Sequence, residues 1–296
     1  MGGVAALALW VLAPRGPAPA GRFEAAPLAR VRTERSFAEG NSVYHEIRLE
    51  SDGGRSHRGL LRIPASGEPP FTAVAMVGGI ESGRRCVRYV PDSGTPILWA
   101  AIDYPYRPPR EADLMTLVRE LPRASDGVER MVAGLRLLLD HLEGRDDVDP
   151  DRTLICGGSL GAFPAVIAGA VDPRFEGVIV LNGGAGLERI VTTNLRIDPP
   201  WMRRAAARML RPWLGPFEPT HFVSRVAPRP FLQIHGTRDR MMPRESAMEL
   251  FEAAEEPKEL LWFDMPHVVQ GDERLSGDVE AAVLDWMARH GFEPPL

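Results

Sequence analysis

Two residue types that often carry chemistry are scarce in this chain of 296 residues. It has 2 cysteines, Cys86 and Cys156, and a single lysine, Lys258. Two cysteines cannot build a disulfide framework or a cysteine-rich zinc site, and no pair of histidines has metal-ligand spacing. The lysine is not part of a phosphate-binding loop, which excludes a P-loop nucleotide site. The sequence therefore predicts neither a metal nor a cofactor.

A net positive charge and a membrane-spanning apolar run are also missing. The formal net charge is −5, which disfavours a general nucleic-acid binder because such a protein must neutralise phosphates. The apolar run at residues 4–13 is too short for a bilayer, which needs about 20 residues. Hydrophobic residues make up 44% of the chain, enough for a buried core. We expect a globular protein with no nucleic-acid partner and no stable membrane span, in an oligomeric state that the sequence leaves open.

The N-terminal segment has features of a secretory leader. Residues 4–13 have the length of a signal-peptide hydrophobic region, and Ala18-Pro19-Ala20 forms a small-residue cleavage site. No lysine or arginine stands before the apolar run, which is unusual for a leader. We predict that residues 1–20 are a signal peptide or an apolar tail. The protein is then exported to the periplasm or secreted, or cytoplasmic if this segment is not a leader.

Two kinds of strand pattern follow one another along residues 21–296. Three segments alternate apolar with charged side chains, which is typical of antiparallel strands with one wet face; they lie at 29–35, 43–50 and 59–64. Six continuous apolar runs are typical of parallel strands covered on both faces; they lie at 72–77, 97–102, 153–156, 177–181, 230–234 and 260–263. Amphipathic helices are predicted at 125–143, 163–171 and 277–290. The pattern predicts one α/β domain, with a mostly parallel sheet, antiparallel N-terminal strands and helices on both faces.

Residues 185–224 interrupt this alternation. The segment contains short helical patterns, and an insertion of this length is usually functional. We predict a small helical lid here. Its aromatic residues Trp201, Trp213 and Phe217 are predicted to line the substrate pocket. The alternative is that they pack the lid onto the core.

The most informative motif is Gly157-Gly-Ser159-Leu160-Gly161, which follows an apolar strand and precedes a helical pattern. In that context Gly-x-Ser-x-Gly predicts a nucleophile elbow. The serine sits on a strained strand-to-helix turn, where Gly157 and Gly161 approach each other too closely to carry side chains. The turn lifts Ser159 Oγ off the end of the sheet and aims the Leu160 N–H toward an oxyanion.

With this motif the chain resembles the α/β-hydrolases over residues 40–292. The likeness is to the esterase branch that includes dienelactone-hydrolase-like and acetyl-xylan-esterase-like enzymes. In that fold the catalytic triad follows the chain order Ser, Asp or Glu, His. The resemblance implies that Ser159 is the nucleophile of such a triad.

The same resemblance points to an acid and a base downstream. The stretch His235-Gly-Thr-Arg-Asp239 matches the family's acid loop, and His267 follows the last predicted strand, where the family keeps its general base. The resemblance thus implies Asp239 and His267 as the remaining triad members. Their competitors are Asp264 and His221. Asn182 occupies the position where some relatives carry the acid, but an amide cannot take that role.

A glycine-rich loop supplies candidates for the other half of the oxyanion hole. Gly78-Gly79-Ile80 follows the first predicted parallel strand. Glycines let a backbone approach the substrate closely and leave an N–H free to donate. We expect the N–H of Ile80 or of Gly79 to act together with that of Leu160.

The resemblance implies a serine hydrolase that cleaves a small-molecule carboxylic ester through an acyl-enzyme. Three alternatives stay open: a prolyl-oligopeptidase-like peptidase, an acyl-CoA thioesterase, and a non-catalytic binding protein on the same fold. Prolyl-oligopeptidase-like enzymes usually carry an aromatic residue after the nucleophile and a second glycine beyond the elbow. Leu160 and Ala162 stand at those positions here.

Overall fold

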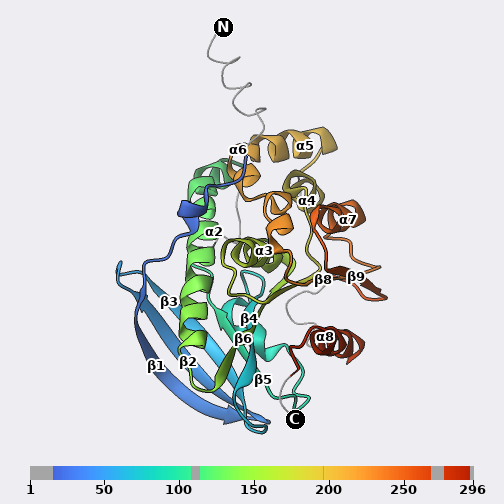
Figure 1. Cartoon of the computed structure of the whole chain (residues 1–296). Coiled ribbons are helices and arrows are strands. Elements are labelled where there is room, and N and C mark those ends of the chain that lie inside the picture. Colours follow the sequence, from blue (N-terminus) through green and yellow to red (C-terminus); the bar gives the residue numbers. More distant parts are fainter. Residues whose placement is uncertain (1–15, 108–113, 196, 268–276, 294–296) are drawn as a thin grey trace.

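One mixed sheet forms the centre of the molecule (Figure 1). The computed structural model describes residues 16–107, 114–195, 197–267 and 277–293. Within these ranges nine strands pair in the order β1-β2-β3-β5-β4-β6-β7-β8-β9. Their bounds are β1 (Leu28–Glu39), β2 (Ser42–Ser51), β3 (Ser56–Pro64), β4 (Phe71–Val77), β5 (Ile97–Ile102), β6 (Val148–Gly158), β7 (Gly177–Leu181), β8 (Phe231–Gly236) and β9 (Lys258–Phe263).

The sheet is antiparallel at its N-terminal edge and parallel elsewhere. β1 pairs antiparallel with β2, β2 with β3, and β3 with β5. All the remaining pairs, from β5 through β9, are parallel. β1 is largely exposed, whereas β4, β7 and β8 are buried along their whole length. The predicted mixed sheet, with antiparallel strands first and continuous apolar strands in the centre, is confirmed.

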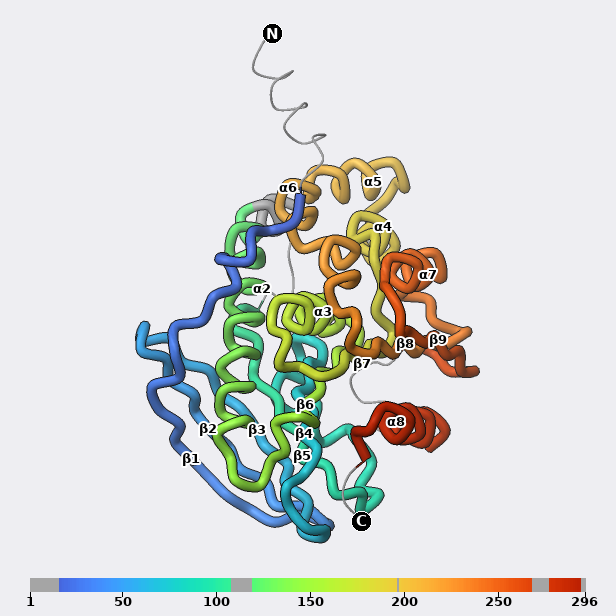
Figure 2. The backbone as a smooth tube through the Cα atoms, in the orientation of Figure 1, coloured from blue at the N-terminus to red at the C-terminus, as the bar shows by residue number. Residues whose placement is uncertain are grey.

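Helices cover both faces of the sheet. α2 (Leu114–Glu143) and α3 (Ala162–Val171) share an apolar core with one face, and Figure 2 shows α2 running along it. α8 (Gly277–Arg289) and the 3-10 helix η2 (Gly83–Arg88) pack on the opposite face. The remaining helices are α4 (Leu187–Asn194), α5 (Pro200–Met209), α6 (Arg211–Leu214) and α7 (Arg244–Ala253), with the short 3-10 helices η1 (Ala20–Phe23), η3 (Ser159–Gly161), η4 (Gly215–Phe217), η5 (Pro219–His221) and η6 (Val223–Val226). None of the helices in the described ranges is both long and apolar enough to cross a membrane.

The segment 185–224 contains α4, α5 and α6, which group together at the top of Figure 1. It is fixed to the N-terminal part of the chain. The ring of Phe23 packs edge-on against those of Phe217 and Phe222, with centroid distances of 6.3 and 5.8 Å. The Ala18 N–H donates to the Pro216 carbonyl at 2.8 Å. Residues 1–15 of the predicted leader lie outside the described residues.

Two helices differ from the sequence-based prediction. α2 begins at Leu114 and contains Pro122, whereas the prediction began the helix at Ser125. A proline in a sequence usually marks a helix boundary, because it cannot donate a backbone hydrogen bond. α7 (Arg244–Ala253) was not predicted. It is short and has a polar face, and Pro243 at its N-cap is the main local sign of its start.

Candidate active site

The loops that follow five neighbouring parallel strands carry the predicted functional residues. Gly79 follows β4, Ser159 follows β6, Asn182 follows β7, Asp239 follows β8 and His267 follows β9. The carboxyl ends of parallel strands meet at one edge of a sheet, which is where α/β proteins bind ligands. The sheet order therefore brings residues together that are up to 188 positions apart (267 − 79).

The turn at Ser159 has the strained geometry of a nucleophile elbow. The backbone φ of Ser159 is +54°, a left-handed conformation that costs a non-glycine residue free energy. A Cβ on Gly161 would lie 2.0 Å from the Val77 carbonyl oxygen, and one on Gly157 would lie 2.6 Å from the Gly161 carbonyl oxygen. Both positions thus exclude any side chain. The two glycines let β6 turn sharply into α3, with Ser159 at the apex.

A continuous hydrogen-bond chain joins the three predicted triad residues. Ser159 Oγ lies 2.7 Å from His267 Nε2, and His267 Nδ1 lies 2.7 Å from Asp239 Oδ2. With the carboxylate as acceptor, the His267 proton lies on Nδ1 and the Nε2 lone pair faces the serine hydroxyl. The geometry allows His267 to accept the proton of Ser159.

Asp239 is held as a carboxylate by donors on both of its oxygens. Its side chain is 2% exposed. Oδ1 accepts the backbone N–H groups of Met241 and Met242 at 2.8 and 2.9 Å, and Oδ2 accepts Asn182 Nδ2 at 2.7 Å. Burial raises the pKa of Asp239, but the hydrogen bonds from His267 and from these amides outweigh it, so the pKa lies below its ordinary value.

Backbone contacts lock the acid loop to the histidine loop. Thr237 N–H donates to the Phe263 carbonyl at 2.8 Å, and Arg238 N–H donates to the Met265 carbonyl at 3.1 Å. A Cβ on Gly236 would lie 2.2 Å from the Met265 carbonyl oxygen, so the two loops touch at this glycine. This packing fixes the distance between the backbones of the two loops that carry Asp239 and His267.

The competing residues lie elsewhere. The Asp264 side chain is 82% exposed and pairs with Arg238 on the surface. His221 lines a separate pocket between α4 and α6. His235 is buried beneath the acid loop, where burial lowers its pKa to about 4. Its Nε2 lies 2.8 Å from Gln233 Nε2, an amide nitrogen that can only donate, so the ring is neutral and structural.

An apolar pocket of about 270 Å³ opens beside Ser159 and His267. Gly79 and Ile80 line it on the side of the β4 loop. Neither of their backbone N–H groups donates to a group in the described part of the chain, while the Gly79 carbonyl is tied back by the Ser82 N–H at 3.1 Å. Leu160 follows Ser159 in the first turn of the helix, where N–H groups have no intrahelical partner. All three predicted oxyanion-hole residues therefore lie next to the nucleophile.

The three aromatic residues predicted to bind substrate lie away from this pocket. Trp201 is 63% exposed on α5. Trp213 lines a surface pocket with Arg22 and Pro122, and Phe217 is buried against Phe23. Phe217 thus packs into the main apolar core together with Phe23, as in the alternative that these aromatics pack the lid onto the core, whereas Trp201 does not pack there.

The pocket is instead lined by residues that the sequence did not predict to bind substrate. These are Met76 at the end of β4, Cys156 on β6, Leu181 at the end of β7, Tyr89 and Val90 after η2, and Met241 in the acid loop. The donation from Asn182 to Asp239 was also missed. For Asn182 a sequence signal existed, because it directly follows the apolar run 177–181. In the structure its φ is +48°, a left-handed conformation that asparagine adopts more readily than most residues.

Sequence comparison finds distant relatives over part of the chain. An uncharacterized protein, YfhR, from Salmonella typhimurium is 24% identical over 152 residues, which are 47% of this chain and 48% of that protein. The matched part of the chain thus spans about half the length of this relative.

Solved structures share the fold over most of the chain. The acetyl xylan esterase from Paenibacillus sp. R4 superposes with a TM-score of 0.67 at 19% identity, covering 89% of each chain. Acetyl xylan esterase 1 from Thermoanaerobacterium sp. JW/SL YS485 has a TM-score of 0.64 at 15% identity, covering 96% of this chain and 98% of that one. The predicted α/β-hydrolase fold is thereby confirmed. Residues 131–291, more than half of the chain, match the prolyl oligopeptidase family. The chain therefore belongs to the prolyl oligopeptidase family of α/β-hydrolases.

Proposed function

We propose that this protein is a serine hydrolase that cleaves a small-molecule carboxylic ester through an acyl-enzyme. The observation that carries the proposal is the unbroken chain of 2.7 Å contacts from Ser159 through His267 to Asp239, placed at the mouth of an apolar pocket. Residues in this arrangement activate a serine hydroxyl for attack on a carbonyl carbon.

The first half-reaction transfers the acyl group to the enzyme. His267 Nε2 takes the proton from Ser159 as Oγ forms a bond to the substrate carbonyl carbon. The tetrahedral intermediate then collapses, the bond to the alcohol oxygen breaks, and His267 returns the proton to that oxygen. Asp239, held ionised by its donors, stabilises the imidazolium while the proton is on His267.

The negative charge that develops on the carbonyl oxygen needs hydrogen-bond donors. The candidates are the N–H of Gly79 or Ile80, which line the pocket, and the N–H of Leu160, which directly follows Ser159 in the first turn of the helix. Removing one such donor typically lowers the rate about 10²–10³-fold. In the second half-reaction His267 takes a proton from water as the water oxygen forms a bond to the acyl carbon. The bond from that carbon to Ser159 Oγ then breaks, His267 returns the proton to Oγ, and the carboxylic acid leaves.

The family match favours a second candidate, a peptidase that cleaves next to proline. Two observations support the ester assignment over it. The structures covering most of this chain with TM-scores of 0.67 and 0.64 are acetyl xylan esterases. Leu160 and Ala162 also stand where prolyl-oligopeptidase-like enzymes usually carry an aromatic residue and a glycine.

The proposal is tested with p-nitrophenyl acetate and a prolyl p-nitroanilide as competing substrates. We expect the wild-type protein to hydrolyse the acetate ester, and Ser159→Ala to reduce kcat by about 10⁶-fold. Faster turnover of the anilide than of the ester would favour the peptidase. Ester turnover that persists at the wild-type rate in Ser159→Ala would refute the assignment of the nucleophile.

A further inference from the structure

The pocket beside Ser159 has a second cavity next to it. This second cavity lies between the sheet, the loop after η2, and α8. Four residues line both spaces: Met76, Val90, Cys156 and Leu181. Since these four residues line both cavities, the cavities are neighbours, and we refer to these residues as the four-residue wall.

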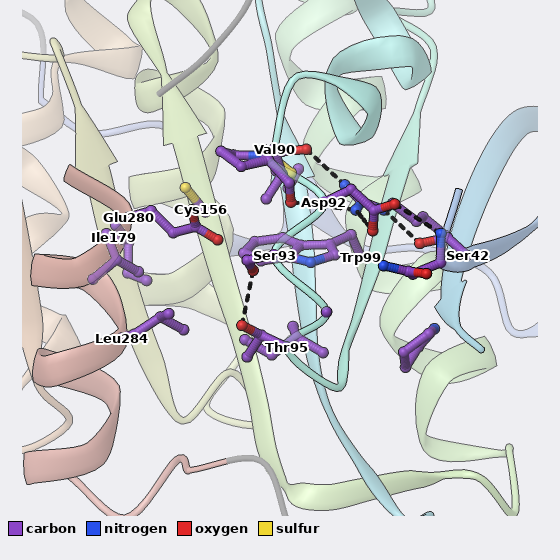
Figure 3. A pocket seen from close by; sticks show the side chains of 18 of the residues that line it. Ser42, Val90, Asp92, Ser93, Thr95, Trp99, Cys156, Ile179, Glu280 and Leu284 are labelled. Atoms are coloured by element: carbon purple, nitrogen blue, oxygen red, sulfur yellow. Dashed lines mark hydrogen bonds and ion pairs between the residues drawn. The ribbon is translucent and has the colours of Figure 1, made fainter. Parts of the chain in front are cut away.

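Strand register places the wall on one face of the sheet. Met76 is the register partner of Cys156, and Cys156 is the partner of Ile179, across β4, β6 and β7. Side chains in register point to the same face, so these three form a row across the strands on one face of the sheet. Figure 3 shows Cys156, Ile179, Glu280 and Leu284 together on one side of the second cavity, with Val90 above its middle.

The lining next to Ser159 is almost entirely apolar. Burial raises the pKa of Cys156 to about 12, so its neutral thiol behaves as a small hydrophobic group. The second cavity measures about 30 Å³, and Ile179, Val283 and Leu284 contribute apolar surface to it. Its lining also has polar side chains, among them those of Asp92, Ser93, Thr95 and Glu280. This volume has room for about two water-sized groups. It can therefore hold the end of an alkyl chain but not a ring.

A buried arginine fixes the wall on the side of the η2 loop. The Arg62 side chain is 6% exposed, and all five of its N–H donors are used. Its guanidinium nitrogens reach the carbonyl oxygens of Val87, Val90 and Pro91 at 3.4, 2.7 and 3.3 Å. They also reach Ser42 Oγ at 2.9 Å and Asp92 Oδ1 at 2.8 Å. Arg62 therefore holds the backbone of Val90 in place, while the Val90 side chain remains free to form part of the wall.

We propose that the two cavities together bind an unbranched apolar acyl chain, and that the four-residue wall and the second cavity behind it set the chain length. The inference rests on the proposed function, because it concerns the acyl group that Ser159 would carry. The acyl group stays attached to the enzyme between the half-reactions and suits an enclosed apolar space, whereas the alcohol must leave past His267 to solvent. The preferred substrates are thus esters of medium-length fatty acids, ahead of acetate esters.

The test is a series of p-nitrophenyl esters from acetyl through butanoyl and hexanoyl to decanoyl. Burying one methylene contributes about 0.8 kcal/mol, which corresponds to about a fourfold increase in kcat/KM. We expect kcat/KM to rise by about this factor per methylene until the chain fills the second cavity, and then to fall. A parallel series of acetate esters with lengthening alkyl alcohols should show no such rise.

Variants of the wall and of the second cavity make the test specific. Val90→Ala and Leu181→Ala shorten side chains of the wall between the two cavities. They should move the acyl length with the highest kcat/KM to longer chains, by two carbons or more. Val90→Ala keeps the backbone carbonyl that Arg62 holds. Val283→Phe fills the second cavity alone and should move the optimum to shorter chains. The matched control is Leu154→Ala, which truncates a leucine buried in the same core but lining neither cavity; it should leave the chain-length profile unchanged.

The outcomes separate this inference from the proposed function. Ser159-dependent hydrolysis with a flat acyl profile, or with the same optimum in Val90→Ala, Leu181→Ala and Val283→Phe, would overturn the acyl-chain assignment alone. A rise along the alcohol series instead would place the alcohol in the cavities and overturn it as well. Absence of Ser159-dependent turnover for every ester would overturn the proposed function and this inference together.

Discussion

Asp239 and Asp264 are carboxylates in adjacent loops with opposite surroundings. Asp239 is 2% exposed and accepts hydrogen bonds from His267, from Asn182 and from two backbone amides. Asp264 is 82% exposed and meets Arg238 on the surface. Exposed ion pairs contribute little to folding stability. A buried carboxylate next to a histidine orients the imidazole and stabilises its charged form. Both aspartates lie between Ser159 and His267 in the sequence, so chain order allows either as the acid. Their burial favours Asp239.

Substituting these two aspartates gives the first prediction. Asp239→Asn keeps the side-chain shape but favours the wrong histidine tautomer, so we expect kcat to fall by about 10⁴-fold. Asp264→Asn is the matched control and should stay within about twofold of the wild type. The measurement is steady-state ester hydrolysis, with circular dichroism to verify folding. Equal losses in both variants would contradict the assignment of Asp239.

At the scale of elements, the strand β6, the elbow and α3 form one unit. The close approach of Gly161 to the Val77 carbonyl also ties this unit to β4, whose following loop carries Gly79 and Ile80. The position of Gly79 and Ile80 relative to Ser159 is therefore set by backbone packing. Gly158, between Gly157 and the serine, has no such constraint, because a Cβ there would meet nothing within 4 Å.

The contrast between Gly161 and Gly158 gives the second prediction. Gly161→Ala places a methyl group 2.0 Å from a backbone oxygen, and we expect the free energy of unfolding to fall by about 3 kcal/mol. Gly158→Ala should change it by less than about 0.5 kcal/mol. Urea denaturation followed by tryptophan fluorescence measures both. A loss in Gly158→Ala as large as in Gly161→Ala would show that the elbow is not constrained as described.

The sequence predicted the sheet and the triad better than the pocket. Apolar runs, the Gly157–Gly161 motif and the His235–Asp239 loop are local patterns, and local patterns specify strands and strand ends. The substrate pocket depends on which side chains from β4, β6, β7 and η2 meet in space, and no local pattern encodes that meeting. For the same reason the sequence did not predict that Trp201, Trp213 and Phe217 lie outside this pocket, since their positions depend on how residues 185–224 pack on the rest of the chain.

For the whole molecule, two buried histidines couple stability to pH. Burial lowers the pKa of His57 to about 4, with the charges of Arg130 and Arg55 adding to the effect. Burial likewise lowers the pKa of His235 to about 4, with Asp239 opposing the shift. Both rings are thus neutral in the folded state at pH values where the unfolded chain, with the ordinary histidine pKa of 6.5, binds a proton.

The third prediction follows from this linkage. Below pH 6.5 the unfolded state takes up protons that the folded state does not, so the free energy of unfolding falls as the pH drops from 6.5 to 4. Each histidine contributes a loss of about 3 kcal/mol at pH 4. His57→Gln removes one of these titrating groups and should flatten the decline by about that amount, as measured by denaturant unfolding across the pH range. An unchanged slope in His57→Gln would contradict the neutral buried state of His57.

The central claim is that Ser159 is the activated nucleophile, and covalent labelling tests it most directly. The folded wild-type protein is treated with a fluorophosphonate, and intact-mass and peptide mass spectrometry locate the adduct. We predict one adduct per chain, on Ser159, formed far more slowly in Asp239→Asn and absent in Ser159→Ala. An adduct on another residue, or no adduct on the folded wild-type protein, would contradict the account.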